Sequence, residues 1–241
     1  DAVVFRIIDQ QRRAETANGP GRGLLSMLLH IQDEETGAPL TDVQLRNATL
    51  TLLLAGHETT ANALTWIFYL LSQHPAVECE LRNEVRAVLG ERVPTLDDLP
   101  RLDYTKMVIK EAMRLYPPIW IIERRVIADD TVGGYHLPAG SAVVIAPYLL
   151  HRHPDFWDRP ETFDPGRFAK RGAAAYIPFG AGPRYCIGSE FAMLEAQLIT
   201  AMVVQSFRLE LAPGHRVEPW LNITLRTRHG LRMLLHPGVG P

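Results

Sequence analysis

YIPFGAGPRYCIGSEFA, residues 176–192, places one of the chain's two cysteines in a loop rich in glycine. Gly180, Gly182 and Gly188 surround Cys186 more densely than side-chain packing requires. Glycine adopts positive φ without strain and lets a backbone come close to another group. The stretch therefore predicts that a bulky group approaches Cys186 across these glycines.

Four chemical roles fit a free cysteine at this position. The commonest is a buried structural residue, a description that fits the other cysteine, Cys79, well. A catalytic nucleophile needs a histidine base nearby, and none flanks the loop. A zinc site needs clustered ligands, for which His151 and His153 are weak candidates. The fourth role is the axial thiolate ligand of haem iron.

The loop supplies what a thiolate ligand of haem iron requires. An iron-bound thiolate is deprotonated, whereas a free cysteine has a pKa of about 8.5, so backbone N–H donors aimed at the sulfur and a helix start behind it favour the site. Arg184 offers a bidentate cation to a haem propionate, and Phe179 can shield the sulfur from water. A flat macrocycle lying over the glycines accounts for their density.

Composition and charge narrow the class of protein. The 241 residues are 46% hydrophobic with a net charge of −2, which fits a globular domain and argues against nucleic acid as a partner. Two cysteines make no disulfide framework, so a reducing, cytoplasmic compartment is expected. The apolar run ATLTLLLAG is broken by His57 and Glu58, so no membrane segment is predicted. The excess of arginine over lysine suggests a GC-rich bacterial source.

The first residues, DAVVFRIIDQQRR, are amphipathic but lack a helix start signal. We interpret them as the end of a helix whose beginning is absent. The chain is therefore expected to be a fragment, a single partial domain over residues 1–241 from which the N-terminal part of the fold is missing.

A long helix is predicted over about residues 42–74. Thr41 caps its start, with Gln44 in the capping-box position, and Pro75 ends it. Through LTLLLAGHETTANALTWIFYLL the helix is apolar on nearly every face, a pattern typical of a helix inside the protein. We expect it to be the central helix.

The following elements are shorter helices. One begins at Pro75. Thr95 and Asp103 are predicted N-caps, and Asp103 opens a helix over about residues 104–115 that the next two prolines end.

After this helix, the residue pattern changes to one that predicts a minor β portion. Residues 121–146 split β-rich runs with turn residues, which predicts short strands and hairpins. An irregular, proline-rich stretch covers residues 153–183, a helix follows the cysteine to about residue 205, and short strands return around Ile223 and Met233. The predicted fold class is mainly α with a minor β portion.

Residues 55–60 of the long helix collect features that cost stability. A buried Glu58 is costly unless paired, Gly56 in a helix interior costs about 1 kcal/mol relative to alanine, and Thr59 can bend the helix by bonding to the preceding turn. One interpretation is a functional site that keeps a small gap beside a proton donor. The other is a satisfied carboxylate beside an ordinary kink, and the stretch alone does not separate the two.

Glu111 and Arg114 lie three residues apart in KEAMR. An exposed pair at this spacing contributes about 0.2–0.5 kcal/mol. Apolar neighbours at 107, 108 and 115 place Glu111 on an inward face, however, where a pair fixes position and is costly to break. Arg167, in FDPGRF, is a second candidate partner for Glu111.

Four motifs together resemble those of the cytochrome P450 superfamily. FGAGPRYCIG is similar to its haem-binding signature F-G-x-G-x-R-x-C-x-G at every fixed position, AGHETT to its oxygen-activating helix motif, EAMR to its E-x-x-R pair and FDPGRF to F-x-P-E-R-F. They occur in the family's order. The resemblance covers the C-terminal part of the family's fold, a little over half, and departs from the pattern at Gly166, where the family has glutamate.

The resemblance implies a role for each matching residue. Cys186 would be the proximal ligand of haem b, and Glu58 and Thr59 would relay protons to iron-bound oxygen, with Ala55 and Gly56 leaving room for it. The other implied assignments are a structural cluster of Glu111, Arg114 and Arg167; haem contacts from Arg184, Arg125 or its neighbour Arg124, Phe179, Gly180, Gly182 and Gly188; and a substrate pocket lined by Ala63, Ile119, Ile121, Ile122, Leu221 and Ile223.

The function that the resemblance implies is that of a monooxygenase. It would insert one oxygen atom from O2 into a small lipophilic organic substrate, with electrons from a separate ferredoxin or flavin reductase. One alternative is a haem-thiolate enzyme that uses peroxide or isomerises its substrate, and another is an inactive fragment that needs its N-terminal complement. The Glu58–Thr59 pair favours the O2-activating version.

Overall fold

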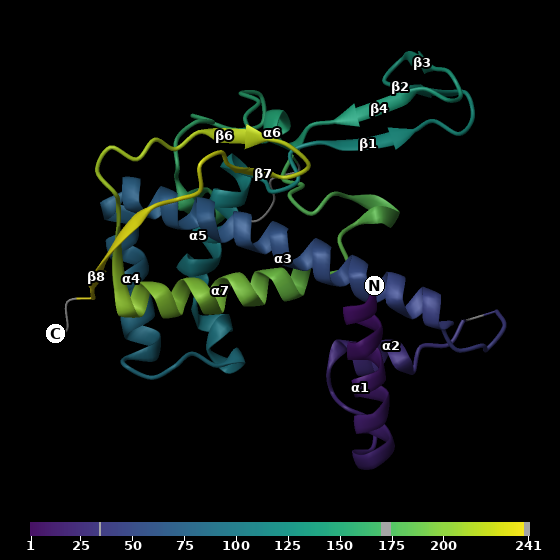
Figure 1. Cartoon of the computed structure of the whole chain (residues 1–241). Coiled ribbons are helices and arrows are strands. Elements are labelled where there is room, and N and C mark those ends of the chain that lie inside the picture. The colour runs from purple at the N-terminus through teal and green to yellow at the C-terminus, as the bar shows by residue number, and fades with distance from the viewer. Residues whose placement is uncertain (34, 170–174, 239–241) are drawn as a thin grey trace. The chain divides into compact units, whose positions relative to one another are not determined.

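The computed structural model describes residues 1–33, 35–169 and 175–238. The chain divides into two compact units, Asp1–Glu58 and Thr59–Pro241. Helices dominate both, and the described strands pair into four two-stranded antiparallel sheets (Figure 1). The predicted class, mainly α with a minor β portion, is confirmed. Part of the irregular stretch predicted over 153–183, residues 170–174, lies outside the described residues.

Residues 1–58 contain α1 (Ala2–Asn18), α2 (Leu24–Leu29) and the first half of α3 (Asp42–Gln73). Val4, Ile8 and Leu45 are buried together in a small core. The start of α3 has the predicted capping box: the Thr41 amide donates to Gln44 Oε1 over 2.9 Å, and the Gln44 amide donates to Thr41 Oγ1 over 3.3 Å.

The predicted burial of α3 is correct for its second half and wrong for part of its first half. Trp66 and Ile67 are 1% and 0% exposed, whereas Leu53 and Leu54 are 58% and 69% exposed. Glu58 is exposed as well, so the expected buried carboxylate is not found. A helix that is apolar all round needs neighbours on every side, and the described residues supply them only after Thr59.

Four helices build the core of residues 59–241: the second half of α3, α4 (Pro75–Leu89), α5 (Asp103–Leu115) and α7 (Ser189–Ser206). They are joined by the shorter helices η1 (Leu96–Arg101), α6 (Pro147–Leu150), η2 (Pro165–Ala169) and η3 (Gly182–Arg184). None of the helices in the described ranges is both long and apolar enough to cross a membrane. The fully or nearly buried side chains of this core include Ile67, Leu71, Leu81, Val85, Val108, Ile109, Ala112, Ala201 and Val204.

Helix α5 begins differently from the prediction. Asp103 is its first residue and Leu102 is the N-cap, without a side-chain capping bond. The carboxylate of Glu84, on α4, accepts the amides of Tyr104 at 2.6 Å and Thr105 at 2.8 Å instead. A helix N-terminus needs acceptors for its first amides, and here a neighbouring helix provides them.

The strands are short and pair locally, except for one long-range pair. β1 (Ile122–Arg125) pairs with β4 (Ala142–Ile145), β2 (Asp130–Val132) with β3 (Tyr135–Leu137), and β6 (Pro219–Leu221) with β7 (Leu225–Thr227). β5 (Phe207–Leu211), which follows α7 directly, pairs with β8 (Met233–Pro237).

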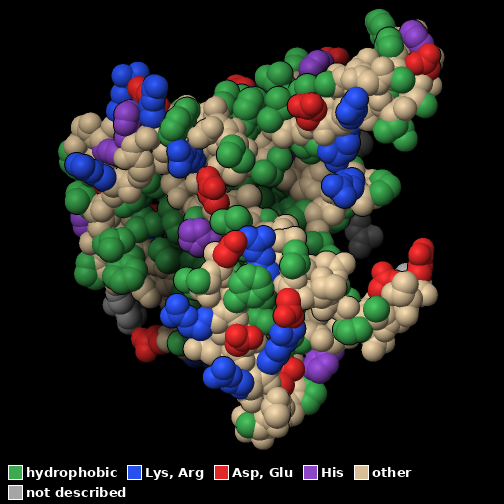
Figure 2. Space-filling model, turned by 45° about the vertical axis from the view of Figure 1, so that its right-hand side comes forward, with side chains coloured by type: hydrophobic (Ala, Val, Ile, Leu, Met, Phe, Trp, Pro, Cys, Tyr) green, Lys and Arg blue, Asp and Glu red, His purple; other side chains and the backbone are tan. Residues whose placement is uncertain are grey.

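The surface carries charges of both signs. Figure 2 shows one face, on which basic and acidic side chains are interspersed and apolar side chains are exposed between them. Cys79 also lies on the surface, which corrects its interpretation as a buried structural cysteine. It occupies an outward position of α4, where helix periodicity places buried residues at 81, 85 and 89.

Candidate functional site

Cys186 lies between η3 and the start of α7, with its side chain exposed. Gly180 and Gly182 have φ of 76° and 70°, in the left-handed region that glycine tolerates. The Cys186 amide donates to the carbonyl of Phe179 over 3.0 Å, which closes the loop. The loop therefore presents the sulfur outward at the N-terminal end of α7.

The sulfur differs from expectation in its hydrogen bonding. Among the described residues, no backbone N–H donates to Cys186 Sγ. The amides of Cys186 and Ser189 donate to the carbonyls of Phe179 and Cys186 instead, over 3.0 and 3.3 Å. The backbone donors to the sulfur that the sequence led us to expect are therefore not found among the described residues, although the side chain of Cys186 is exposed.

The side chains beside the loop suit a flat apolar group. Phe179 packs against the main core and meets Tyr185 edge-on, with ring centroids 6.4 Å apart. Arg184 is exposed in η3. The exposed sulfur can ligate iron, the aromatic ring can contact an apolar macrocycle and the adjacent cation can bind a propionate, so the residues present fit haem.

Strand β1 approaches the loop at Ile122. The Cδ1 atom of Ile122 lies 3.7 Å from the position that a Cβ on Gly180 would take. Side chains two apart on a strand share a face, so Arg124 is on the face of Ile122 and Arg125 on the opposite one. Both arginines are exposed, and the pleat makes Arg124 the better candidate of the two for a propionate.

Behind the loop, the structure brings Glu111, Arg114 and Arg167 together. Arg114 binds Glu111 through two parallel hydrogen bonds, Nε to Oε2 at 2.8 Å and Nη2 to Oε1 at 2.9 Å, and both side chains are 0% exposed. Arg167 Nε is 3.2 Å from Glu111 Oε1, and the Asp164 amide donates to the same oxygen over 2.9 Å. Each buried charge is therefore compensated.

Arg114 also organises the chain between α6 and η2. Its guanidinium donates to the carbonyls of His151, Pro160 and Thr162 at 2.7, 2.7 and 3.1 Å. Its Cζ lies 5.1 Å from the centre of the Trp157 ring. The pair on α5 thus fixes the path of a segment with little regular structure of its own.

The residues of the AGHETT motif follow one another on α3. Ala55, Gly56 and Glu58 are exposed, and Thr59 is half-buried. No heavy atom lies within 4 Å of the position that a Cβ on Gly56 would take, so the helix leaves open space there. These four residues keep their predicted roles as proposals.

Three segments predicted to line a substrate pocket are joined by hydrogen bonds. Asn62 Nδ2, on α3, donates to Thr224 Oγ1 over 3.1 Å, and the Leu225 amide donates to the Pro118 carbonyl over 2.8 Å. Trp120 Nε1 donates to the Asn222 carbonyl over 2.6 Å.

Several of the predicted pocket residues are accessible. Leu221, Ile223 and Ile121 are 47%, 84% and 36% exposed, and Ile119 and Ile122 are half-buried. Ala63 lies in the core at 7% exposure.

Sequence reasoning missed the position of His151. It is 0% exposed, whereas His153 lies at the surface. No group of three or more His, Cys, Asp and Glu that could hold a metal occurs in the described ranges, which leaves the zinc interpretation without support. The apolar YLL before His151 was the available signal that it points inward.

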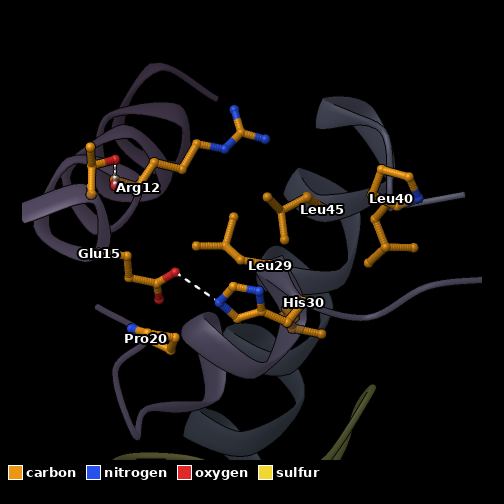
Figure 3. Close-up of a pocket in the computed structure, with 10 residues that line it drawn as sticks. Arg12, Glu15, Pro20, Leu29, His30, Leu40 and Leu45 are labelled. Carbon is orange, nitrogen blue, oxygen red and sulfur yellow. Dashed lines mark hydrogen bonds and ion pairs between the residues drawn. The ribbon is translucent and has the colours of Figure 1, made fainter. Parts of the chain in front are cut away.

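A cavity of about 550 Å³ within residues 1–58 contains none of the predicted site residues. Figure 3 shows Arg12 and Glu15 on one helix, and Leu29 and His30 next to each other across from them, with the His30 ring directed at Glu15. Its polar groups have partners: Arg12 forms an ion pair with Asp42 at 2.5 Å, and His30 Nε2 lies 3.1 Å from Glu15 Oε2. The chemistry predicted from the sequence lies elsewhere.

Comparison with known proteins identifies the family of the site. The cytochrome P450 family model matches residues 2–233. The chain belongs to the cytochrome P450 family. It is 41% identical over 240 residues to a cyclooctatin synthase from Streptomyces melanosporofaciens, covering 98% of this chain and 52% of that protein.

Further relatives lead to the same family. A pentalenene oxygenase from Streptomyces avermitilis is 38% identical over 238 residues, covering 97% of this chain and 52% of that protein. A retinoic acid-bound cyanobacterial CYP120A1 superposes with a TM-score of 0.89 at 33% identity, covering 98% of this P450 chain and 56% of that one. The chain spans about half the length of the curated relatives it matches.

Proposed function

We propose that this chain is the haem-ligating part of a haem-thiolate monooxygenase that inserts one oxygen atom from O2 into a lipophilic organic substrate. The observation that carries the proposal is Cys186, whose exposed sulfur is presented by the positive-φ glycines Gly180 and Gly182 at the start of α7. Haem bound there would supply the iron chemistry that activates O2. Haem b is the form we propose.

The protein residues would hold the cofactor and its surroundings. The Cys186 thiolate would ligate the iron, and Phe179 would limit the access of water to the sulfur. Arg184 and Arg124 would each offer a planar cation to a propionate, a geometry that permits two parallel hydrogen bonds. The buried Glu111–Arg114–Arg167 cluster would keep α5 and the segment ahead of the loop in register.

Proton delivery is assigned to Glu58 and Thr59. A carboxylate followed by a hydroxyl on one helix offers a proton source and a hydrogen-bond relay, and the open space at Gly56 would admit a small ligand. If Thr59 relays protons, Thr59→Ala should lower product formed per electron consumed. Thr65→Ala is the control, because it removes a threonine hydroxyl from the same helix outside the AGHETT motif, one that donates to the Ala61 carbonyl.

The substrate and electron donor are the finer parts of the proposal. Relatives named pentalenene oxygenase and cyclooctat-9-en-7-ol 5-monooxygenase support a terpene-like substrate, and the exposed side chains of Leu221 and Ile223 would provide apolar contacts. Electrons would come from a separate ferredoxin or flavin reductase. Relatives from Streptomyces support a bacterial source, and a cytoplasmic location remains part of the proposal.

A second candidate is a half-module that is inactive until a complementary polypeptide covers it. The exposure of Leu53, Leu54, Ile187 and Phe191, at 58%, 69%, 94% and 72%, favours it, because burying such side chains stabilises a protein. Supplying the N-terminal half of a relative in trans should then raise haem uptake.

The deciding experiment is the absorption spectrum of the chain with haem, reduced, with and without carbon monoxide. A strongly red-shifted Soret band, lost in Cys186→Ser and retained in Cys79→Ser, supports thiolate ligation by Cys186. Cys79 is a matched control because it is the other exposed cysteine. A histidine-like band, both alone and with the complementary half, would refute the proposal.

A further inference from the structure

His151 is a fully buried imidazole at the C-terminal end of α6. Its ring centroid lies 5.4 Å from that of Tyr176 and 6.3 Å from that of Trp157. Its own carbonyl accepts Arg114 Nη1 at 2.7 Å, and its amide donates to the Pro147 carbonyl over 2.8 Å. Side chain and backbone are therefore both held in place.

The two ring nitrogens of His151 bind backbone groups from separate parts of the chain. Nδ1 is 3.2 Å from the carbonyl oxygen of Arg114, which can only accept, so Nδ1 carries the proton. Nε2 is 2.9 Å from the amide nitrogen of Ile177, which can only donate, so Nε2 is the acceptor. The contacts therefore assign one neutral tautomer.

Ile177 connects this imidazole to the thiolate loop. The carbonyl of Ile177 accepts the Gly180 amide at 3.0 Å, which forms the turn that leads into the loop. Two residues after Ile177, the carbonyl of Phe179 accepts the Cys186 amide at 3.0 Å. A short series of hydrogen bonds thus runs from the end of α5 through His151 to the backbone that carries the sulfur.

We propose that His151 is a positioning residue that fixes the backbone ahead of the thiolate loop to the end of α5, and that it does so only as the neutral imidazole. The inference rests on the proposed role of Cys186 as the haem ligand. Under this proposal, the segment 147–151 helps to position the thiolate loop. Neither zinc binding nor general packing would give it that role.

Protonation would break the connection at one defined bond. A charged imidazole carries an N–H on Nε2, which would face the N–H of Ile177 with no acceptor between them. Burial lowers the pKa of His151 to about 4; the hydrogen bond to the Arg114 carbonyl opposes this shift, and the charges of the Arg114 and Arg152 side chains add to it. The surroundings therefore keep the ring neutral at ordinary pH.

The other titratable groups that face the His151 ring do not favour its protonated form. Glu111 is bound to Arg114 and Arg167. Burial raises the pKa of Tyr176 well above its ordinary value, so that the phenol stays neutral, and its hydroxyl donates to the Lys110 carbonyl over 3.0 Å.

Two substitutions separate the two hydrogen bonds. His151→Gln places an amide oxygen near the position of Nε2, where it can accept the Ile177 N–H at any pH. His151→Asn is shorter, so it can reach the Arg114 carbonyl but leaves the Ile177 N–H without an acceptor. His153→Gln is the matched control, because His153 is exposed and its Nδ1 accepts the amide of Asp155, two residues on, over 3.3 Å, so its contact is local and at the surface.

The full chain reconstituted with haem is measured in two ways. The first is the fraction of the reduced CO complex that has the thiolate-type Soret band, between pH 7 and 4. We expect it to fall with acid in the wild type and His153→Gln, to fall at lower pH in His151→Gln, and to be reduced already at pH 7 in His151→Asn. Identical pH profiles for the wild type and His151→Gln would overturn the proposal.

The second measurement is hydrogen exchange at the amides of Ile177 and Gly180, which needs no thiolate band. Exchange should be roughly ten- to hundredfold faster in His151→Asn than in His151→Gln. Equal exchange in the two variants would refute the positioning role even if Cys186 ligates haem. If the wild type and every variant lack the thiolate band while the exchange difference between His151→Asn and His151→Gln is present, only the ligand role of Cys186 is refuted. If His151→Asn does not fold, nitrogen NMR of the wild-type imidazole decides: an Nε2–H tautomer would contradict the proposal.

Discussion

Arg114→Lys keeps a positive charge beside Glu111 while removing the planar fork that binds it. The guanidinium makes two hydrogen bonds to Glu111, at 2.8 and 2.9 Å, and three to the carbonyls of His151, Pro160 and Thr162. An ammonium group has three N–H donors at one nitrogen, so at least two of these five acceptors lose their partner. Each buried acceptor without a partner costs about 1–3 kcal/mol, so we expect the free energy of unfolding to fall by about 2–6 kcal/mol.

Urea unfolding followed by circular dichroism measures this loss. The control is Arg208→Lys, because Arg208 is 51% exposed and pairs with an exposed Glu210 at 3.3 Å. An exposed pair contributes less than about 1 kcal/mol, so the control should change stability little. If Arg114→Lys costs no more than Arg208→Lys, then the buried cluster does not stabilise the fold in the way we argue.

Three further predictions concern pH, propionate binding and the loop. Because the folded state disfavours the proton on His151, the unfolded state binds more protons between pH 6.5 and about 4. The free energy of unfolding should therefore decrease as the pH falls through this window, by on the order of 3 kcal/mol. Urea titrations at several pH values should show that this free energy depends less steeply on pH in His151→Gln. Arg124→Ala should weaken haem binding more than Arg125→Ala, measured by haem titration, and the reverse order would contradict the face assignment. Gly180→Ala should cost about 1–2 kcal/mol because its φ is 76°, whereas Gly188→Ala should cost less because its φ is −89°; thermal unfolding compares the two.

Local signals in the sequence predicted most of the helix boundaries. Thr41 with Gln44, and Thr95 with Asp98, form capping boxes because both members lie within one turn of each other. The start of α5 could not be predicted in this way. Its amides bind Glu84, about twenty residues earlier, and nothing in the local pattern indicates that two helices will meet there.

Burial was harder to predict than secondary structure. Leu53 and Leu54 are as apolar as Leu70 and Leu71, yet only the second pair is buried. The apolar sequence of a helix face indicates that burial would stabilise it, but does not indicate whether another element covers it. The exposed Cys79 and the buried His151 reverse the ordinary preferences of their residue types because tertiary contacts decide the matter.

The motifs of the site were predicted, but only some of their connections were. The sequence places Glu111 and Arg114 on one turn and offers Arg167 as a further partner, and the structure adds the amide of Asp164 to the same carboxylate. The bond between His151 and Ile177 joins residues 26 apart through an imidazole and a backbone amide. No spacing rule describes such a contact, because it depends on how α5 and α6 pack.

The guanidinium of Arg114 holds the segment 151–162 by three carbonyl oxygens, and Trp157 is the side chain of the segment that it faces. Every amino acid has a carbonyl, so these contacts do not constrain which side chains occupy the segment. Apart from Arg159, whose φ of 43° disfavours β-branched residues, the exposed positions between His151 and Glu161 should accept wide substitution while the backbone path is unchanged. A single arginine on α5 thereby gives this stretch freedom to diversify its surface, including the surface it offers to other molecules, without altering the geometry of the thiolate loop that follows it.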